Sequence, residues 1–220
     1  MDLFTKIQAA KFEFAKNAFL LKRFANDVQI LADLQAIISA APLRHMMTPM
    51  GFAMSAAMTN CGQLGWVSDK KCYRYDALDS NTGLAWPQMS ASFLALAQSA
   101  AAACGFANFV PDACLINQYK VGASMGLHQD KNELDFSQPI VSVSLGIPAT
   151  FLFGGLKRSD KTDKIPLNHG DVVVWGGEAR LKFHGIMPLK ATNIQTNDHA
   201  VPNNKILAAY RYNLTFRKAG

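Results

Sequence analysis

The residues best suited to chemistry are His128 and Asp130, which lie two positions apart in the run Leu127-His128-Gln129-Asp130. On a β-strand, this spacing places an imidazole and a carboxylate on one face, about 7 Å apart along the chain. One more histidine would complete a facial triad of two histidines and one carboxylate. Such a triad holds Fe(II) and leaves positions open for oxygen chemistry. We therefore predict a non-haem iron site at His128 and Asp130.

The third ligand must come from one of four further histidines: His45, His169, His184 and His199. His169 stands immediately before Gly-Asp, which is typical of a turn. His184 follows an alternating segment and is itself followed by glycine, so its backbone can approach a ligand cluster closely. We predict that His184 completes the triad.

The segment from Arg211 to Arg217 has the same two-residue period, which would place its polar members on one face of a strand: Arg211, Asn213, Thr215 and Arg217. Arginine presents a planar fork that matches a carboxylate with two hydrogen bonds. The two arginines would lie about 20 Å apart along the strand, so they would bracket a small acid instead of gripping one end of it. An exposed terminal charge is the alternative interpretation of Arg217.

Two polar residues of an earlier expected strand, Asn117 and Tyr119, share one face and would add hydrogen-bonding groups to this anion site. Alternatively, Asn117 only satisfies backbone groups of its own sheet. Contacts to nucleic acid would come from another set, in which aromatic side chains stand near basic ones: Met58, Trp66, Tyr73, Tyr75 and Arg158. Aromatic rings stack on bases while cations contact phosphate. Ordinary packing and solvated charges explain this set equally well.

Two helices are expected in the first half of the chain. Asn26 can cap a helix whose apolar residues run from Ile30 to Ile38. Ser90 can cap a second helix, with Gly105 at its C-terminal end. Residues 46–87, between them, are rich in Met, Gly, Asn and Tyr and are expected to form a lid or a set of short strands.

From Pro111 onward, short alternating or β-branched runs are punctuated by glycine and proline, which predicts many short strands. The expected strands are 113–119, 139–145, 150–153, 172–175, 181–186 and 206–216. This pattern favours an α+β fold, with a jelly roll backed by the N-terminal helices. We expect one integrated domain, with the helices and lid in residues 1–110 and the catalytic core in 111–220. The polar stretch 191–205 is the longest expected loop.

The chain has 220 residues, of which half are apolar, and this is enough for one domain with a substantial core. Its formal charge of +6 and isoelectric point near 9.2 favour a polyanionic partner, although a mildly basic soluble protein fits equally well. The four cysteines form no CxxC pair, which favours a reduced, cytoplasmic protein over a zinc or disulfide scaffold. The start of the chain lacks an apolar signal segment, and the alanine-rich stretch 91–110 is too weakly apolar to span a membrane. We expect a monomer without a membrane segment.

Taken together, these motifs resemble the AlkB family of iron- and 2-oxoglutarate-dependent nucleic-acid dealkylases, and its bacterial prototype in particular. The resemblance runs from about residue 42 to the end of the chain. It is carried by ordered segments at 58–66, 111–117, 127–131, 140–146, 153–158, 169–177 and 211–217.

The resemblance implies a double-stranded β-helix with a nucleotide-recognition lid, and Fe(II) bound by His128, Asp130 and His184. It implies that 2-oxoglutarate, used together with O2, is held by Arg211 and Arg217 with help from Asn117, Tyr119 and Asn213. A flipped alkylated base would stack between Trp66 and His128, and further substrate contacts would come from Thr48, Met58, Tyr73 and Arg158. The implied reaction is oxidative demethylation of 1-methyladenine or 3-methylcytosine in DNA or RNA, with release of formaldehyde, succinate and CO2.

The sequence departs from the bacterial prototype at two places. Residue 132 is asparagine where the prototype has an acidic residue, and this position is expected to contact the damaged base. The 191–205 loop is also expected to be longer. Two rival functions stay open: a related 2-oxoglutarate oxygenase that acts on a protein or a small molecule, and a non-catalytic binding module on the same scaffold. The aromatic and basic lid disfavours the first rival, and the complete triad disfavours the second.

Overall fold

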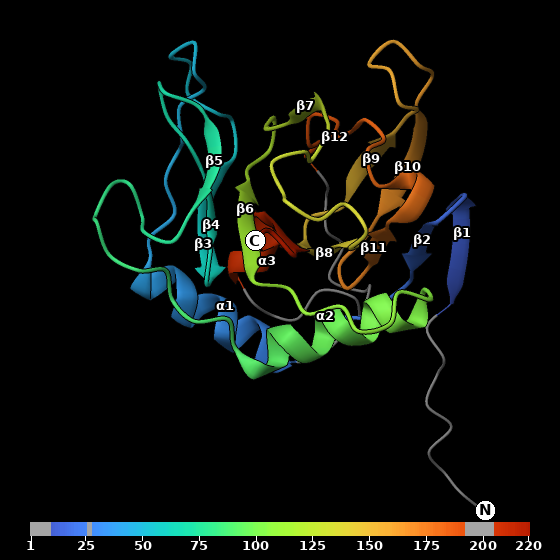
Figure 1. The fold of residues 1–220 in the computed structure, drawn as a ribbon, viewed down its shortest axis with the longest axis horizontal. Helices are drawn as coiled ribbons and strands as arrows, with labels where there is room; N and C mark the ends of the chain where they lie inside the picture. Colours follow the sequence, from blue (N-terminus) through green and yellow to red (C-terminus); the bar gives the residue numbers. More distant parts are fainter. Residues whose placement is uncertain (1–9, 26–27, 192–204) are drawn as a thin grey trace, which may run out of the picture.

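The computed structural model describes residues 10–25, 28–191 and 205–220, and in this part of the chain the protein is mostly β (Figure 1). The larger of its antiparallel sheets has seven strands, in the order β1 (Lys11–Ala15), β2 (Ala18–Leu21), β11 (Val172–Trp175), β8 (Ile140–Gly146), β13 (Arg211–Arg217), β6 (Ala113–Tyr119) and β3 (Ala57–Gly62). The smaller sheet has the order β10 (Asp163–Leu167), β9 (Ala149–Phe153), β12 (His184–Ile186) and β7 (Met125–His128). A separate hairpin pairs β4 (Gly65–Ser68) with β5 (Tyr73–Asp76).

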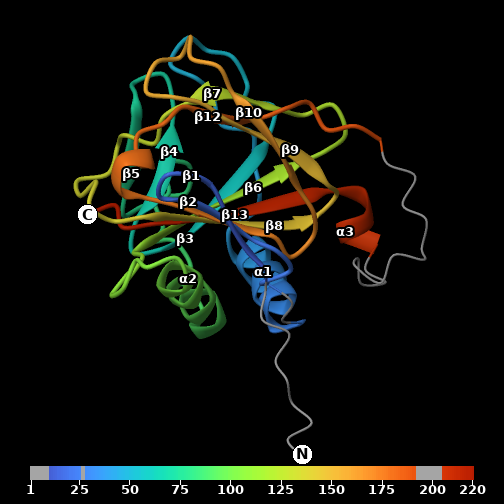
Figure 2. The same ribbon diagram turned by 90° about the vertical axis from the view of Figure 1, so that its right-hand side faces the viewer.

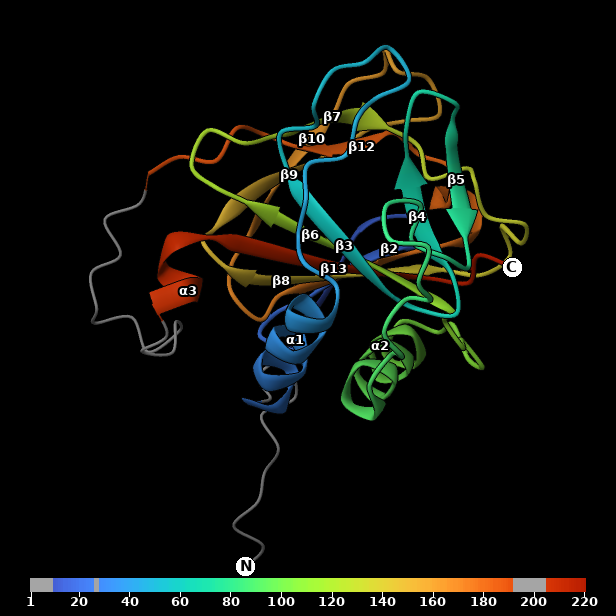
Figure 3. The same ribbon diagram turned by 90° about the vertical axis from the view of Figure 1, so that its left-hand side faces the viewer.

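Two helices, α1 (Val28–Ala40) and α2 (Ala91–Ala103), lie side by side against one face of the larger sheet (Figures 2 and 3). This face is apolar because alternate residues of the central strands point to the helices. Phe216 of β13, for example, packs edge-on against Phe93 of α2, with ring centroids 5.7 Å apart. Burial of this face fixes the register of β13, since a slip of one residue would turn its arginines into the apolar layer.

The opposite face of the larger sheet looks toward the smaller sheet, and a second apolar cluster fills part of the space between them. Trp175 of β11 packs against Phe151 of β9, with ring centroids 5.9 Å apart. The remaining space between the sheets is lined by the polar side chains of β6, β8 and β13. The alternation along these strands therefore divides an apolar layer from a polar interior.

The two predicted helices are confirmed. The hydroxyl of Ser90 accepts a hydrogen bond from the backbone of Phe93, and Gly105, just past the helix, has a φ of +87° that favours glycine. The expected cap Asn26 lies outside the described residues. Two short helices were not predicted: η1 (Gly177–Ala179) and α3 (Lys205–Ala209).

The predicted strands are confirmed near 113–119, 139–145, 150–153 and 172–175, and two predicted strands were too long. Residues 205–209 form α3, so the last strand begins at Arg211 and not at residue 206. The strand predicted at 181–186 is limited to β12, because residues 177–183 form η1 and its exit turn. Most of the predicted 191–205 loop lies outside the described residues.

The N-terminal strands β1 and β2 were missed, although Phe12 and Phe14 alternate with charged residues as a strand requires. They form a tight hairpin in which Asn17 adopts a φ of +59°, a conformation that asparagine tolerates. The larger sheet thus takes β1, β2 and β3 from the first 110 residues and its other strands from the remainder. Within the described residues, no helix is long and apolar enough to cross a membrane.

Candidate active site

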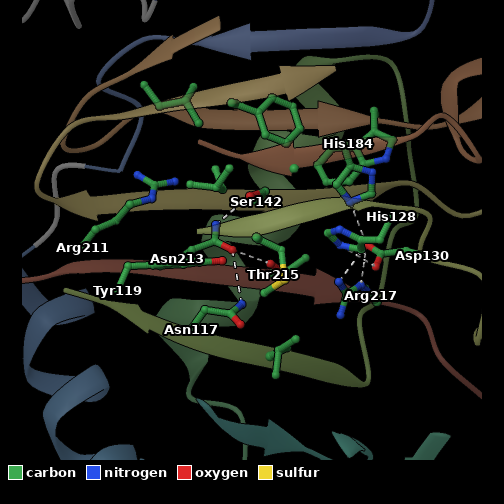
Figure 4. A pocket seen from close by; sticks show the side chains of 17 residues that line it. Asn117, Tyr119, His128, Asp130, Ser142, His184, Arg211, Asn213, Thr215 and Arg217 are labelled. Carbon is green, nitrogen blue, oxygen red and sulfur yellow. Dashed lines mark hydrogen bonds and ion pairs between the residues drawn. The ribbon is translucent and has the colours of Figure 1, made fainter. Parts of the chain in front are cut away.

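A narrow pocket lies between the two sheets, and the predicted site residues of the β half line it (Figure 4). His128, Asp130, His184 and Arg217 gather at one end, while Arg211 lies at the other. Asn117, Tyr119 and Asn213 lie between these two ends. The structure therefore brings together every residue predicted to hold iron or 2-oxoglutarate.

The candidate metal ligands are brought together by the pairing of β7 with β12, in which His184 is the register partner of His128. One ligand atom from each of His128, Asp130 and His184 lies within 4.8 Å of the others. The Nε2 atoms of His128 and His184 lie 3.8 Å and 3.6 Å from the oxygens of the Asp130 carboxylate. Three donors at these separations can surround one metal ion.

The backbone around the two histidines selects their tautomers. Nδ1 of His128 lies 2.9 Å from the backbone oxygen of Gly126, and Nδ1 of His184 lies 3.0 Å from that of Lys182. A carbonyl can only accept, so each Nδ1 carries the proton and each Nε2 presents its lone pair. In metal sites, a hydrogen bond from the ring nitrogen that does not bind the metal orients a histidine ligand in this way.

Asp130 does not lie on the strand, because β7 ends at His128. The prediction that both residues share one strand face was wrong in this detail. The backbone oxygen of Asp130 accepts a hydrogen bond from Nη1 of Arg180 over 2.8 Å instead of pairing in a sheet. The carboxylate still reaches the two imidazoles, with its oxygens 3.8 Å and 3.6 Å from their Nε2 atoms.

The electrostatics of the triad favour the metal-binding protonation states. Burial, assisted by the neighbouring His184, lowers the pKa of His128 to about 4. Burial alone would raise the pKa of Asp130, but Arg217 and the two histidines hold it well below its usual value. At neutral pH His128 is therefore neutral and Asp130 is ionised, as ligation of a divalent metal requires. The donor set fits Fe(II).

The far end of the pocket carries a buried cation with incomplete partners. Arg211 is only 1% exposed, and Nη2 donates to the hydroxyl of Ser144 over 3.0 Å. Its Nε and Nη1 have no hydrogen-bond partner among the described residues. Burial lowers the pKa of Arg211 to about 10, so the guanidinium stays charged at neutral pH. An uncompensated buried charge is costly, and this end of the pocket therefore fits a carboxylate.

Arg217 lies at the metal end, so the two arginines occupy opposite ends of the pocket as predicted (Figure 4). Its Nη2 and Nε donate to Oδ2 of Asp130 over 2.7 Å and 3.1 Å. The side chain is buried, and the alternative interpretation of Arg217 as an exposed terminal charge was wrong. Its ion pair shows that Arg217 already has a carboxylate partner within the protein, whereas Arg211 has none among the described residues.

Between the two ends, the amide of Asn213 joins several side chains. It donates to the hydroxyl of Ser142 over 2.7 Å and accepts from that of Thr215 over 2.8 Å. Nδ2 of Asn117 lies 3.5 Å from Oδ1 of Asn213, while Oδ1 of Asn117 has no partner among the described residues. Burial raises the pKa of Tyr119 to about 12, so its hydroxyl stays protonated. This polar row offers donors and acceptors to an elongated acid.

Beside the pocket, the hairpin of β4 and β5, here called the recognition hairpin, carries two of the predicted substrate contacts. The rings of Trp66 and Tyr73 are stacked, with centroids 5.5 Å apart and planes inclined by 14°. Nε1 of Trp66 donates to the side-chain oxygen of Asn132 over 3.4 Å. Trp66, Tyr73 and Asn132 are therefore one group, and Asn132 and Tyr73 are exposed.

The other three predicted substrate residues are more dispersed. Met58 is fully buried in a small apolar cluster, and Trp66 packs against this cluster. Met58 therefore helps to hold the Trp66 ring in place. The hydroxyl of Thr48 accepts from the backbone of Phe52 in a turn. Arg158 is exposed on the loop after β9, with its guanidinium 5.5 Å from the ring centre of Phe183. The loops of Thr48 and Arg158 project at the same end of the molecule (Figure 3).

Three residues of the site were missed or misplaced by the sequence patterns. Glu133 and Arg180 are buried beside the triad and form an ion pair, with Nη2 3.1 Å from Oε2. Tyr75, interpreted as a nucleic-acid contact, donates its hydroxyl to Oε1 of Glu133 over 2.6 Å. Burial raises the pKa of Tyr75 well above its ordinary value. Nothing in the local sequence of Arg180 signals this role, because η1 alone brings it to the site.

Comparison with known proteins agrees with this geometry. Residues 17–217 match the 2OG-Fe(II) oxygenase superfamily. The alpha-ketoglutarate-dependent dioxygenase AlkB of Escherichia coli strain K12 is 49% identical over 100% of this chain and 98% of its own length. The nucleic acid dioxygenase ALKBH1 of Mus musculus is 35% identical over 56% of this chain and 32% of its own length. A solved structure of OsALKBH1 superimposes with a TM-score of 0.78 at 29% identity, covering 95% of this chain and 100% of that one.

The fold, the triad and these matches define a dioxygenase that depends on Fe(II), 2-oxoglutarate and O2. Within this superfamily, the chain belongs to the AlkB family. The family resemblance seen in the sequence motifs is thereby confirmed.

Proposed function

We propose that the protein demethylates N-alkylated bases such as 1-methyladenine and 3-methylcytosine in DNA, and also in RNA. The observation that carries this proposal is the content of one pocket. It has three metal-binding side chains at one end and the incompletely paired cation Arg211 at the other. The stacked pair of Trp66 and Tyr73 stands on the hairpin next to it.

In the proposed site, His128, Asp130 and His184 hold Fe(II), and Arg211 holds the distal carboxylate of 2-oxoglutarate. Arg217, Asn117, Tyr119 and Asn213 complete the 2-oxoglutarate site. Bound there together with O2, Fe(II) and 2-oxoglutarate would supply a two-electron oxidation that hydroxylates the methyl group of the base, with succinate and CO2 as co-products. The hydroxymethyl group on nitrogen then leaves as formaldehyde, and the base is restored.

The protein's own contribution is positioning and charge. Hydrogen bonds from Nδ1 to backbone oxygens orient both imidazoles, and Arg217 keeps Asp130 ionised. Arg211 is fixed by Ser144 and by its burial in the sheet, so little ordering is needed when an acid binds. The position of the pocket between two sheets keeps bulk water from most of these groups.

Base recognition is assigned to the recognition hairpin and the nearby loops. A methylated base is inaccessible inside a stacked duplex, so the target base must be extruded. We assign Trp66 and His128 to the two faces of that base, Asn132 to its edge, and the surrounding contacts to Thr48, Met58, Tyr73 and Arg158. The net charge of +6 and the similarity to the mouse nucleic acid dioxygenase support a nucleic-acid substrate.

We further propose that the two facing sheets form a double-stranded β-helix. Residues 111–220 would supply the catalytic core, and residues 1–110 would supply base recognition and the outer strands and helices.

The test is product mass on a short oligonucleotide that carries one 3-methylcytosine, incubated with Fe(II), 2-oxoglutarate and O2. Loss of one methylene unit of mass from the base, matched by succinate and formaldehyde, is expected. A succinate yield that does not respond to the methylated oligonucleotide, but rises with a protein or small-molecule substrate, would overturn the proposal.

A further inference from the structure

Beside the triad, two carboxylates and two guanidinium groups are buried together: Asp130, Glu133, Arg180 and Arg217. Their formal charges balance, as is usual for ions that are removed from water. Asp130 is a proposed metal ligand and Arg217 its direct partner. Glu133 and Arg180 are not among the residues that could hold the metal in the described part of the chain. Their burial therefore calls for another explanation.

Arg180 holds the segment that follows β7 at three points. It donates hydrogen bonds to the backbone oxygens of Asp130 and Gln138, over 2.8 Å and 3.0 Å, and it forms an ion pair with the Glu133 carboxylate. These contacts fix a stretch of backbone that has no strand partner. The position of the Asp130 carboxylate therefore depends on Arg180.

Glu133 sets how strongly Arg217 holds Asp130. Nε of Arg217 lies 3.4 Å from Oε1 of Glu133, while Nη2 lies 2.7 Å from Oδ2 of Asp130. Glu133 offsets part of the charge of Arg217. Without this offset, Arg217 would compete more strongly with a metal cation for the Asp130 carboxylate and would also repel the cation.

The same Glu133 oxygen receives the hydroxyl of Tyr75, which belongs to the recognition hairpin. Tyr75 is the register partner of Trp66, the proposed base-stacking residue. A continuous chain of polar contacts thus runs from the hairpin through Tyr75, Glu133 and Arg217 to Asp130.

We propose that Glu133 and Arg180 are positioning residues for the metal-binding carboxylate, and that Tyr75 couples them to the recognition hairpin. This inference rests on the proposed function, because it needs a metal on Asp130 and a base on the hairpin. Fixing the hairpin with a substrate base fixes Tyr75, and with it the charge that Glu133 presents to Arg217. Because coupling between two binding sites is reciprocal, substrate tightens metal binding and metal tightens substrate binding.

The experiment measures the affinity of the protein for Mn(II) in the absence of O2. The concentration of free Mn(II) is read from its electron paramagnetic resonance signal. The affinity is measured with and without a short oligonucleotide that carries 3-methylcytosine, in the presence of 2-oxoglutarate. In the unchanged protein, we expect the oligonucleotide to tighten Mn(II) binding by about 5-fold or more. In Tyr75→Phe, which keeps the ring and loses only the hydroxyl, we expect this factor to fall to nearly 1. An unchanged factor in Tyr75→Phe, or no coupling in the unchanged protein, overturns the inference.

The matched control is Tyr210→Phe, which also removes one tyrosine hydroxyl but lies outside the pocket and the recognition hairpin, against the ring of Tyr212. It is expected to keep the coupling factor. His184→Ala distinguishes a failure of the proposed metal site from a failure of the proposed coupling. If Mn(II) binds equally well to this variant, the proposed metal site is wrong. If Mn(II) binding is lost there but Tyr75→Phe behaves like the unchanged protein, only the coupling is wrong.

A second variant tests Glu133 without the oligonucleotide. Glu133→Gln keeps an acceptor for Tyr75 but removes the charge that offsets Arg217, so it should weaken Mn(II) binding by about tenfold or more, as is usual for residues behind metal ligands. Glu133→Asp should restore part of the affinity. Mn(II) binding equal to that of the unchanged protein, in a Glu133→Gln variant that melts cooperatively, overturns the positioning role. If Glu133→Gln does not fold, Glu133→Asp decides, because an Mn(II) affinity equal to that of the unchanged protein in this variant overturns the positioning role.

Discussion

His184 lies directly opposite His128 across the antiparallel pair of β12 and β7, with their ring centroids 4.4 Å apart. The two residues are far apart in the sequence, and only strand pairing makes them neighbours. In antiparallel strands, the Cβ atoms of directly opposed residues lie closer together than those of diagonal neighbours. Two imidazoles are thus placed within reach of one metal ion, and Asp130 approaches from the segment that follows β7.

The first prediction concerns this pair. His184→Ala should abolish turnover and weaken Mn(II) binding strongly, while thermal unfolding stays cooperative. The physical reason is the loss of one of three protein ligands from a site whose other contacts remain. His45→Ala is the matched control, because His45 is exposed and its one hydrogen bond among the described residues is to the backbone oxygen of Met54. Near-normal activity of His184→Ala would show that the third ligand is another residue.

The second prediction separates the two arginines. Arg211→Lys should raise the KM for 2-oxoglutarate by about 10- to 150-fold, the equivalent of roughly 1.5–3 kcal/mol for a lost charge-assisted pair. Mn(II) affinity should change little, because Arg211 lies at the end of the pocket away from the triad (Figure 4). The measurement is initial rate against 2-oxoglutarate concentration, together with Mn(II) titration. An unchanged KM would remove Arg211 from the co-substrate site.

Arg217→Lys should behave differently. It should also raise the KM for 2-oxoglutarate, much more than it alters oligonucleotide binding. In addition it should weaken Mn(II) binding, because Arg217 is the ion-pair partner of Asp130. A variant whose KM for 2-oxoglutarate and Mn(II) affinity both match the unchanged protein would contradict the assigned position of Arg217.

The third prediction concerns Asn132, where the sequence departs from the bacterial prototype. A carboxylate here would favour a positively charged base such as 1-methyladenine or 3-methylcytosine on Coulomb grounds. Asn132→Asp should therefore raise the preference for cationic over neutral lesions by about 1 kcal/mol, since Asn132 is exposed and the effective dielectric is high. The measurement is competition between a cationic lesion and the neutral 1-methylguanine in otherwise identical oligonucleotides at one salt concentration. Equal product ratios for both proteins would show that residue 132 does not sense base charge.

The fourth prediction concerns pH. The pKa of His128 is lowered to about 4 in the folded protein, whereas an unfolded histidine has a pKa of about 6.5. The unfolded chain therefore binds the proton more readily, and the stability of the metal-free protein should fall as pH drops from about 6.5 toward 4. Burial also lowers the pKa of His169, which adds to the same trend.

The effect of His128 should be modest, because 37% of its side chain is exposed and solvent screens its charge. The measurement is urea unfolding of metal-free protein at several pH values in this window. His128→Asn should give a shallower dependence on pH. An identical slope in the two proteins would show that folding does not lower the pKa of His128.

The two-residue period at 211–217 and the cap of α2 at Ser90 are local properties, and the sequence alone was enough to predict them. Alternation decides which side chains share a face, so the polar row of β13 and its apolar reverse could be predicted without any partner strand. The cap at Ser90 depends only on the next three residues.

Tertiary structure decided which side chains of other elements these strand faces contact. The register of β7 with β12 selected His184. Burial without a counter-ion in the described part of the chain distinguished Arg211 from Arg217, although both are arginines on the same strand face. Arg180, Glu133 and Tyr75 were assembled from η1, the segment after β7 and the recognition hairpin. Charge pairing of this kind depends on distance and on exclusion of water, and neither is encoded in the spacing of residues along one segment.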